Sequence, residues 1–487
     1  YGGNAKAMEI IAGNICADFD RDFDAYLGSA GESQSLETGL QQLIVNQFDR
    51  LQKLDADAYE LLCRAGCYRY QGLARVNADA LSSLLWDVEP QQRSQVINSL
   101  KNRSLIEYYR GKYLLHPAIR AEAISRLRQT DRWIQSNQQA AKFWINSVNH
   151  IIDITTAITA LEAYYHYIEI GDFQQAAQVL LQPRSNQWGQ FLPLASNLYR
   201  MGSIQPVLAA IEQIVPSLLP SRSTAELSNI LGDLYWIIGR VHEAIETQQY
   251  TINYTTKSLA QSDSSDLSHD TYCLKILNLD SLLSIGLYHI DLWELNEASS
   301  YFKRVIEMAN NTIHDRWEQK ATACLALVQS DLGNIDRVRK LLTKIEPLII
   351  QQKWTGSSAY FLQIIGQTYT NLGQYDRANT IYQQILTFCQ TGNYLQIQGR
   401  TLTGLAQLDR LQGNLQIAQT THLQAIEILT RLGAKCDLAE AYYQAGLTWK
   451  QAGDLAQSQV YCNFHAHQLF TEIVAPRQLE KIEIGRS

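Results

Sequence analysis

One pair of cysteines and one pair of histidines stand close enough in this sequence to suggest metal chemistry. Cys63 and Cys67 are four residues apart, which places both thiols on one face of a helix. No second pair follows at the spacing of a zinc site. His465 and His467 are two residues apart, so they diverge around a helix, and no third ligand accompanies them. We interpret both pairs as packing residues and expect no metal.

Patterns of catalytic residues are also missing. The sequence contains no G-x-x-x-x-G-K-[ST] loop, which would cradle nucleotide phosphates. No Ser-His-Asp, Cys-His or paired-carboxylate arrangement stands out either. We predict that the chain is not an enzyme and has no cofactor of its own. A longer parent protein could still be an ATPase that binds ADP or ATP.

A cluster of basic residues between positions 93 and 128 could serve nucleic-acid binding. The cluster has two carboxylates, Glu107 and Glu122, and its positive charges exceed them by six. The basic residues are Arg93, Lys101, Arg103, Arg110, Lys112, Arg120, Arg126 and Arg128. Such residues more often solvate a helical face. The whole chain carries a net charge of -7 with a pI near 5.8, which argues against bulk attraction to nucleic acid. We do not expect nucleic acid as the partner.

Composition indicates a large cytoplasmic protein. The chain has 487 residues, of which 46% are hydrophobic, so it can build several cores. Its eight cysteines are scattered, as is usual in a reducing cytoplasm. No apolar run reaches the ~20 residues of a membrane-spanning helix. The first residues show neither an initiator Met nor a signal pattern, and we read the chain as part of a larger protein.

A period of 40 residues gives the strongest prediction of architecture. Helix-to-helix turns recur at 292–293, 332–333, 372–373, 412–413 and 452–453. Seven residues before each turn stands a small residue, and these are Gly286, Ala326, Gly366, Ala406 and Gly446. Close helix crossings tolerate only small side chains at such positions. The pattern therefore predicts a stacked array of helical hairpins, which is typically a binding surface.

The sequence divides into four regions. Residues 1–30 carry one amphipathic helix, and residues 36–129 have the layout of a winged-helix domain. In that domain, segments 105–109 and 112–115 flank Arg110-Gly111 and predict a hairpin, the wing. Residues 131–475 are predicted to form a helical superhelix. Residues 476–487 are expected to be a tail, either loose or a short capping helix. The predicted fold class is therefore mainly all-α.

The repeated units resemble tetratricopeptide repeats (TPR). In residues 359–386, the positions where that family has its signature residues are occupied by Gly366, Tyr369, Gly373, Tyr375, Ala378 and Tyr382. The 40-residue period is similar to that of the long-helix sensor arms of bacterial signalling ATPases. This resemblance implies an α-solenoid of TPR-like helical hairpins that binds proteins.

The first 129 residues resemble the end of an NB-ARC module of signal-transduction (STAND) ATPases. The start, YGGNAKAMEIIAG, is similar to a segment that contacts adenine through a proline, and Ala5 replaces that proline. Residues 113–120 resemble the segment that closes the winged helix, where a histidine reaches the ADP phosphate. The resemblance thus implies nucleotide sensing through His116, Gly3 and Ala5, with Pro117 in place of the family's aspartate.

The first helix of each hairpin is expected to line a concave groove. Counted from the small residue, positions -3, +1, +4 and +5 point inward. The resulting partner-binding set is polar and rich in amides, and consists of Asn229, Asp233, Trp236, Asp291, Asp331, Gln363, Gln367, Asn371, Gln407, Arg410, Tyr443 and Lys450. Such a lining suits an extended peptide or a protein loop.

Three functions fit these observations. The first is the interaction or sensor module of a signal-transduction ATPase, in which the groove binds a protein or peptide and the winged helix relays the nucleotide state. The second is a constitutive TPR scaffold or assembly factor for a large complex. The third is a small-molecule-sensing regulator with a DNA-binding winged helix, which needs an enclosed aromatic pocket; Trp236 and Trp293 are candidates for its walls.

Overall fold

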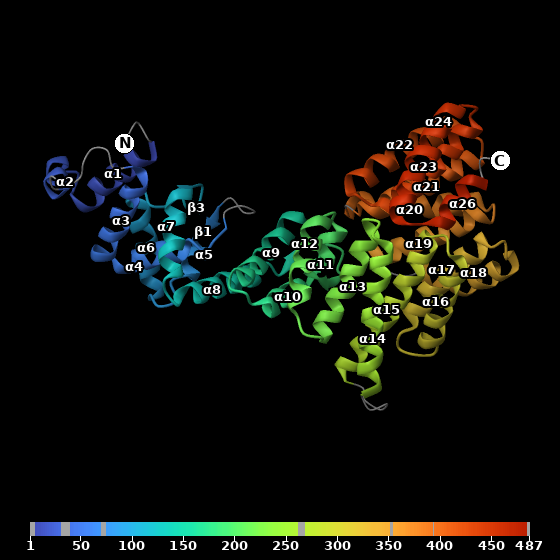
Figure 1. The fold of residues 1–487 in the computed structure, drawn as a ribbon, viewed down its shortest axis with the longest axis horizontal. Coiled ribbons are helices and arrows are strands. Elements are labelled where there is room, and N and C mark those ends of the chain that lie inside the picture. The colour runs from blue at the N-terminus through green and yellow to red at the C-terminus, as the bar shows by residue number, and fades with distance from the viewer. Residues whose placement is uncertain are drawn as a thin grey trace. The chain divides into compact units, whose positions relative to one another are not determined.

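The computed structural model describes residues 5–30, 39–69, 75–261, 268–350, 354–392 and 394–484. Helices dominate it and the strands are very short, so the all-α prediction is confirmed (Figure 1). The chain forms two compact units, Tyr1–Leu180 and Leu181–Ser487. None of the described helices is both long and apolar enough to cross a bilayer.

The first unit combines helices with a small three-stranded sheet in the order β1-β3-β2. Its elements are α1 (Ala5–Asp18), α2 (Phe23–Ala30), α3 (Leu40–Leu54), α4 (Ala56–Ala65), β1 (Val76–Asn77), α5 (Ala78–Ser83), α6 (Pro90–Asn102), β2 (Glu107–Tyr109), β3 (Lys112–Leu114), α7 (Pro117–Arg128), α8 (Arg132–Ser147), β4 (His150–Ile151), α9 (Ile154–Glu169) and α10 (Phe173–Leu181).

The expected hairpin forms from β2 and β3. These strands pair antiparallel, with Tyr108 opposite Tyr113. Arg110 and Gly111 connect them with φ of +49° and +80°. A two-residue turn with positive φ at both positions matches the right-handed twist of the strands. The hairpin is therefore encoded locally by Arg110-Gly111.

The first unit extends further than the predicted winged-helix domain. Helix α8 packs against α4, α5 and α7, and it also pairs with α9. Residues 131–180 therefore belong to the first compact unit, whereas the sequence placed them in the helical array. The interpretation of residues 36–129 as a winged helix stays a prediction, and residues 36–38 lie outside the described ranges.

The second unit is a succession of antiparallel helix pairs. Its elements are β5 (Pro183–Asn186), β6 (Phe191–Pro193), α11 (Leu194–Arg200), α12 (Ile204–Ile214), η1 (Val215–Ser217), α13 (Arg222–Ile237), α14 (Val241–Gln261), α15 (His269–Asp291), α16 (Leu295–Ala309), α17 (Asp315–Asp331), α18 (Ile335–Ile350), α19 (Gly356–Asn371), α20 (Tyr375–Gly392), α21 (Leu395–Leu411), α22 (Leu415–Leu432), α23 (Lys435–Gln451), α24 (Leu455–Gln459), η2 (Val460–Ala466), α25 (His467–Ile473) and α26 (Pro476–Ile484).

The small residues of the 40-residue period lie where the two helices of a pair cross. A Cβ atom on Gly366 would stand 2.6 Å from the ring of Tyr382, and one on Gly286 would stand 2.5 Å from the ring of Phe302. Both rings are fully buried. The aromatic side chain of the second helix thus occupies the space that the glycine leaves free, which explains the sequence pattern.

The helical array closes on itself. Helix α13 packs against α23, about 200 residues later in the chain. The thiol of Cys436 donates to the backbone oxygen of Trp236 over 3.5 Å, and Nε2 of His242 lies 3.0 Å from the backbone oxygen of Val474. The inner helices therefore surround an interior instead of lining an open groove.

Helix α26 packs against this interior. Residues 476–484, expected as a loose tail or a short capping helix, form a helix in which Gln478 and Ile482 are buried. Nε2 of Gln478 donates to the backbone oxygen of Asp291 over 2.9 Å. This segment is therefore a capping helix as far as residue 484, and residues 485–487 lie outside the described ranges.

Candidate functional site

The larger of two interior cavities lies between the first helices of successive pairs and α26. Its volume is about 330 Å³. Of the twelve residues predicted to bind a partner, eight line it: Asp291, Asp331, Gln363, Gln367, Asn371, Gln407, Arg410 and Tyr443. The structure brings these residues together, while their role in binding stays a prediction.

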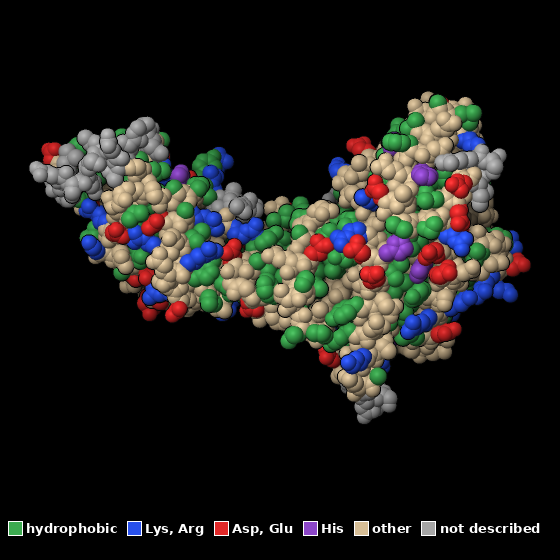
Figure 2. Space-filling model, in the orientation of Figure 1, with side chains coloured by type: hydrophobic (Ala, Val, Ile, Leu, Met, Phe, Trp, Pro, Cys, Tyr) green, Lys and Arg blue, Asp and Glu red, His purple; other side chains and the backbone are tan. Residues whose placement is uncertain are grey.

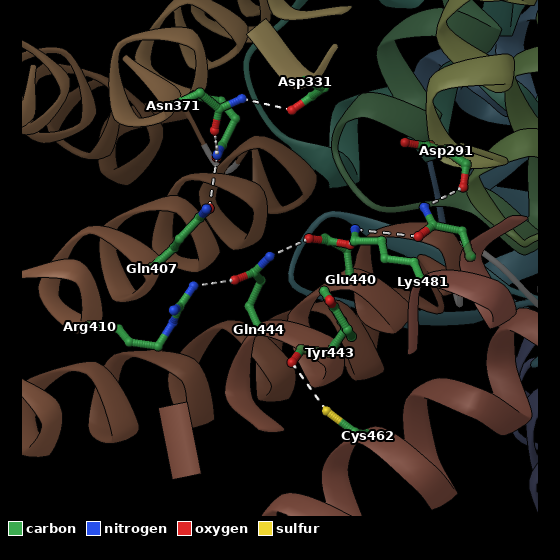
Figure 3. A network of polar contacts seen from close by, with 12 residues as sticks. Asp291, Asp331, Asn371, Gln407, Arg410, Glu440, Tyr443, Gln444, Cys462 and Lys481 are labelled. Carbon is green, nitrogen blue, oxygen red and sulfur yellow. Dashed lines mark hydrogen bonds and ion pairs between the residues drawn. The ribbon is translucent and has the colours of Figure 1, made fainter. Parts of the chain in front are cut away.

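Amide side chains form a ladder along one wall of this larger cavity. Nε2 of Gln367 donates to Oε1 of Gln407 over 2.8 Å, and Nδ2 of Asn371 donates to Oδ1 of Asp331 over 2.7 Å (Figure 3). Both bonds join residues that are 40 positions apart. The ladder therefore follows directly from the repeat, because equivalent inward positions on neighbouring helices face each other.

A second polar chain runs along α23 to α26. Nη2 of Arg410 donates to Oε1 of Gln444 over 3.0 Å, and Nε2 of Gln444 donates to Oε1 of Glu440 over 2.7 Å (Figure 3). Oε2 of Glu440 then lies 3.4 Å from Nζ of Lys481. These contacts connect Arg410 to α26, although Nε of Arg410 itself is buried with no hydrogen-bond partner among the described residues.

Lys481 of α26 reaches into a cage of aromatic and acidic side chains. Its Nζ lies 4.0 Å from the ring centre of Trp293 and 4.5 Å from that of Tyr443. Such distances allow cation–π attraction, and Glu440 adds an opposite charge. The cage therefore holds the ammonium group of the chain's own Lys481.

Trp293 occupies a backbone position that normally favours glycine. Its φ is +61°. At the equivalent position of the later turns the residue with positive φ is a glycine, namely Gly333, Gly373, Gly413 or Gly453. A bulky residue in the left-handed region costs of order 1–3 kcal/mol. The residue with this strained backbone, Trp293, also lines the larger cavity.

Burial changes the ionisation of the acidic wall. It raises the pKa of Asp331 to about 7, against the opposing effects of Lys481 and of the hydrogen bond from Asn371. It raises the pKa of Asp291 in the same direction, and Asp437 adds to the shift while Arg400 opposes it. Arg400 itself pairs with Asp437 at 2.5 Å. The wall is therefore sensitive to protons near neutral pH.

A smaller cavity of about 170 Å³ lies next along the interior, and two further predicted residues, Asp233 and Trp236, line it. Oδ1 of Asp233 accepts hydrogen bonds from the hydroxyls of Tyr288 and Ser284 at 2.8 Å and 3.3 Å. Burial raises the pKa of Asp233 to about 6. The predicted set is thus divided between two cavities.

The other predicted residues lie elsewhere. Asn229 is buried and donates to Oε1 of Gln248 and Oγ of Ser281, so it joins helices instead of facing a cavity. Lys450 is exposed and lines neither cavity. Nδ1 of His116 accepts the backbone N–H of Ala118 over 3.3 Å and caps α7. Ala5 is exposed at the start of α1, and Gly3 lies outside the described residues.

The sequence contained a second inward ladder that the counting of positions missed. Six residues before each small residue stand Asp280, Lys320, Tyr360, Arg400 and Glu440. All five line one of the two cavities. The sequence pattern that could have identified these residues is the same 40-residue period, with a charged or aromatic residue six positions before each small residue. Gln478 and Lys481, which contact this interior from α26, have no counterpart in the period.

The basic residues of the first unit are largely engaged within it. Nη2 of Arg103 lies 2.7 Å from Oδ1 of Asp18, Nη2 of Arg126 lies 2.7 Å from Oδ1 of Asp49, and Nη2 of Arg128 lies 3.1 Å from Oε2 of Glu169. On the face drawn in Figure 2, basic and acidic side chains are interspersed. Among the described residues, no group of three His, Cys, Asp or Glu side chains is placed to hold a metal.

Comparison with known proteins adds one family match. The tetratricopeptide repeat profile matches residues 359–390, which cover most of α19 and α20. The uncharacterized WD repeat-containing protein alr2800 of Nostoc sp. is 29% identical over 119 residues. That stretch covers 24% of this chain and 9% of the Nostoc protein, so this chain matches only a small part of its relative.

Solved structures with similar folds include three helical-repeat proteins. A STAND protein with a tetratricopeptide repeat sensor from Pyrococcus horikoshii is 14% identical, with a TM-score of 0.48, over 88% of this chain and 59% of that protein. The Rap conjugation gene regulator of plasmid pLS20, in complex with the Phr* peptide, is 12% identical, with a TM-score of 0.46, over 83% and 91%. Aspartyl phosphate phosphatase F from Bacillus subtilis is 11% identical, with a TM-score of 0.43, over 88% and 94%. All three are distant likenesses of fold, with TM-scores below 0.5.

Proposed function

We propose that the helical array is a sensor module that binds a peptide or a protein segment in its larger cavity. The observation that carries this proposal is the ladder of amides and carboxylates at 40-residue spacing along the wall of this cavity. Amide side chains offer both donors and acceptors, which is what an extended backbone needs from a binding wall. The repeat match at residues 359–390 falls in the centre of this wall.

Helix α26 supports the proposal because it is a protein segment already held at this wall. Gln478 is fixed by a backbone carbonyl, and Lys481 by two rings and a carboxylate. A buried aromatic anchor surrounded by hydrogen bonds is the usual energetic design of a recognition site. The strained backbone of Trp293 agrees with a role in binding, since such strain concentrates at functional positions.

The proposal is tested by selecting peptides from a displayed random library on the purified chain. The variant Gln367→Ala/Asn371→Ala/Arg410→Ala removes two amides and one guanidinium from the larger cavity. A matched control, Gln416→Ala/Gln424→Ala/Arg431→Ala, removes the same groups from the exposed side of α22. We expect enriched peptides to bind the control as they bind the unmodified chain and to lose binding to the cavity variant. Equal binding to all three proteins would exclude the larger cavity as the site.

We further propose that this module belongs to a signal-transduction ATPase whose first unit relays the nucleotide state. The similarity of residues 113–120 to the segment that closes an NB-ARC winged helix supports this. The experiment is retention of a selected peptide by the full-length parent protein with ADP or ATP. A nucleotide-dependent change that His116→Ala abolishes would support the relay, and identical retention in both states would favour a constitutive scaffold.

A further inference from the structure

The smaller cavity differs in chemistry from the larger one. Its walls come from α11, α13, α15, α17, α19 and α21, and they carry the rings of Tyr199, Trp236, Tyr360, Phe361 and Tyr394. Its volume of about 170 Å³ leaves room for on the order of ten water-sized groups. A concave, partly open space lined by aromatic rings with a few polar groups is the usual form of a small-molecule site.

The carboxylates of this smaller cavity accept their hydrogen bonds from neutral donors. Asp233 accepts from the hydroxyls of Tyr288 and Ser284, and its other oxygen lies 3.4 Å from the hydroxyl of Tyr199. Asp280 accepts from Nε1 of Trp317 over 3.2 Å. Within the described ranges, neither carboxylate forms an ion pair with a cation of the cavity.

The cations of the same cavity are in the opposite situation. Nζ of Lys320 lies 4.9 Å from the ring centre of Trp317 and 5.4 Å from that of Phe361, and no carboxylate among the described residues is within ion-pair distance of it. Nε of Arg200 donates a long bond of 3.5 Å to the hydroxyl of Tyr199, and no shorter bond of its guanidinium is found among the described residues. Most of the N–H groups of these two side chains therefore remain available to a ligand.

Arg200 and Lys320 act on one another in this space. Burial lowers the pKa of Lys320; Asp280 opposes this effect, and the positive charge of Arg200 adds to it. Asp233 in turn favours the charged form of Arg200. Among the described residues neither cation has a carboxylate within ion-pair distance, so Asp233 and Asp280 act on them without direct contact. A ligand carboxylate between the two cations would supply the direct ion pairs that they lack, and the Arg200 guanidinium can hold it with two parallel hydrogen bonds.

We infer that the smaller cavity binds a small organic monocarboxylate with an aromatic body, its carboxylate on Arg200 and Lys320 and its ring against Trp236 and Tyr360. Two acidic residues in the same wall disfavour a ligand with several negative charges. This site is separate from the peptide site proposed above and does not depend on it. It would make the array a sensor of a metabolite as well as of a protein segment.

The test uses three single-ring acids, phenylacetate, 3-phenylpropionate and indole-3-acetate, each paired with its neutral primary amide. Binding to the purified chain is measured by ligand-detected NMR and by the shift of the thermal unfolding midpoint. We expect at least one acid to bind and raise the midpoint, while its amide does neither. Failure of all three acids, or equal binding of acid and amide, would overturn the inference.

Variants locate the binding within the array. Lys320→Met and Arg200→Gln should each weaken binding of the acid about tenfold or more, whereas Lys340→Met, on the exposed side of α18, should leave it unchanged. Without ligand, Lys320→Met should unfold at the same or a higher temperature, because an apolar chain replaces a poorly solvated ammonium. A lower midpoint for Lys320→Met would assign Lys320 a structural role and contradict the inference, as would unchanged binding by both cavity variants.

Discussion

Nε1 of Trp236 donates a hydrogen bond of 2.6 Å to Oδ2 of Asp291. Trp236 lines the smaller cavity and Asp291 lines the larger one. The backbone oxygen of Trp236 also accepts from the thiol of Cys436, where the two ends of the closed array meet. One residue therefore contacts both cavities and the closure of the array.

Removing the indole donor should destabilise the array, relative to the unmodified chain, by more at neutral pH than in mild acid. In Trp236→Phe, Asp291 loses the hydrogen bond that favours its ionised form, so its already raised pKa rises further. A buried carboxylate without its donor costs about 1–3 kcal/mol, but a protonated carboxyl costs less. Urea unfolding at about pH 7.5 and about pH 5.5 measures the difference. Equal destabilisation at both pH values would contradict this explanation.

Two buried aspartates should each contribute stability to the folded state as the pH falls from about 7.5 to about 5.5. Burial raises the pKa of Asp233 to about 6 and that of Asp331 to about 7, whereas an unfolded aspartate titrates at about 3.9. At these two sites the folded chain binds protons that the unfolded chain does not bind, and their contribution is lost as the pH rises through the folded pKa values. The buried His166 and His422 act in the opposite direction, because burial lowers their pKa values to about 3 and only the unfolded chain protonates them in this range.

Asp331→Asn provides the comparison for this pH effect. The variant cannot ionise at position 331, so the contribution of this site to stability on acidification is lost, and the gain in urea midpoint over the unmodified chain should be largest at about pH 7.5 and smaller at about pH 5.5. Asp336→Asn, an exposed site on α18, should keep the original pH dependence. An unchanged profile for Asp331→Asn would mean that other groups produce the effect.

Enlarging the glycine of a repeat should disrupt one helix pair. Gly366→Ala would place a Cβ 2.6 Å from the Tyr382 ring, and overpacking of this kind typically costs about 1–3 kcal/mol. Chemical denaturation measures the loss. In a Tyr382→Leu background, which removes the ring, the same change should cost much less. A cost that is independent of residue 382 would argue against the crossing contact.

Lys481 should hold α26 against the array. Lys481→Met keeps the length of the side chain but removes its charge, and with it the attraction to the rings of Trp293 and Tyr443, which is worth up to about 2 kcal/mol. Hydrogen exchange in residues 476–484 should become correspondingly faster. Arg477→Met is the control, because Arg477 is exposed and forms its ion pair with Glu480 on its own helix. Similar exchange in both variants would show that the lysine does not anchor α26.

The repeating part of the fold could be predicted because its physical causes are local. The 40-residue spacing placed Gly366 against a second helix, and the structure finds the ring of Tyr382 there. Positive φ at the turn glycines has the same local origin. Eight inward residues, Gln367 and Gln407 among them, also follow from the period alone, since equivalent positions must face each other.

The parts that escaped prediction depend on contacts between distant segments. Nothing near Trp236 in the sequence indicates that it meets Asp291 or Cys436, because these contacts arise only when the array completes a turn. Lys481 likewise lies outside the repeat and enters the interior from α26. Arg200 and Lys320 come from different structural contexts, one before the regular repeats and one within them, and only the fold places them on one cavity.

Closure of the array also restricts how this protein can change over evolution. Repeat proteins usually diversify by gaining or losing whole units, because each unit touches only its neighbours. Here α13 must meet α23, and Asp291 must meet Gln478, so an additional unit between them would separate both pairs and open both cavities. Duplications are therefore tolerated only outside the closed turn. Within it, new specificity has to arise by single substitutions at inward positions of the 40-residue register.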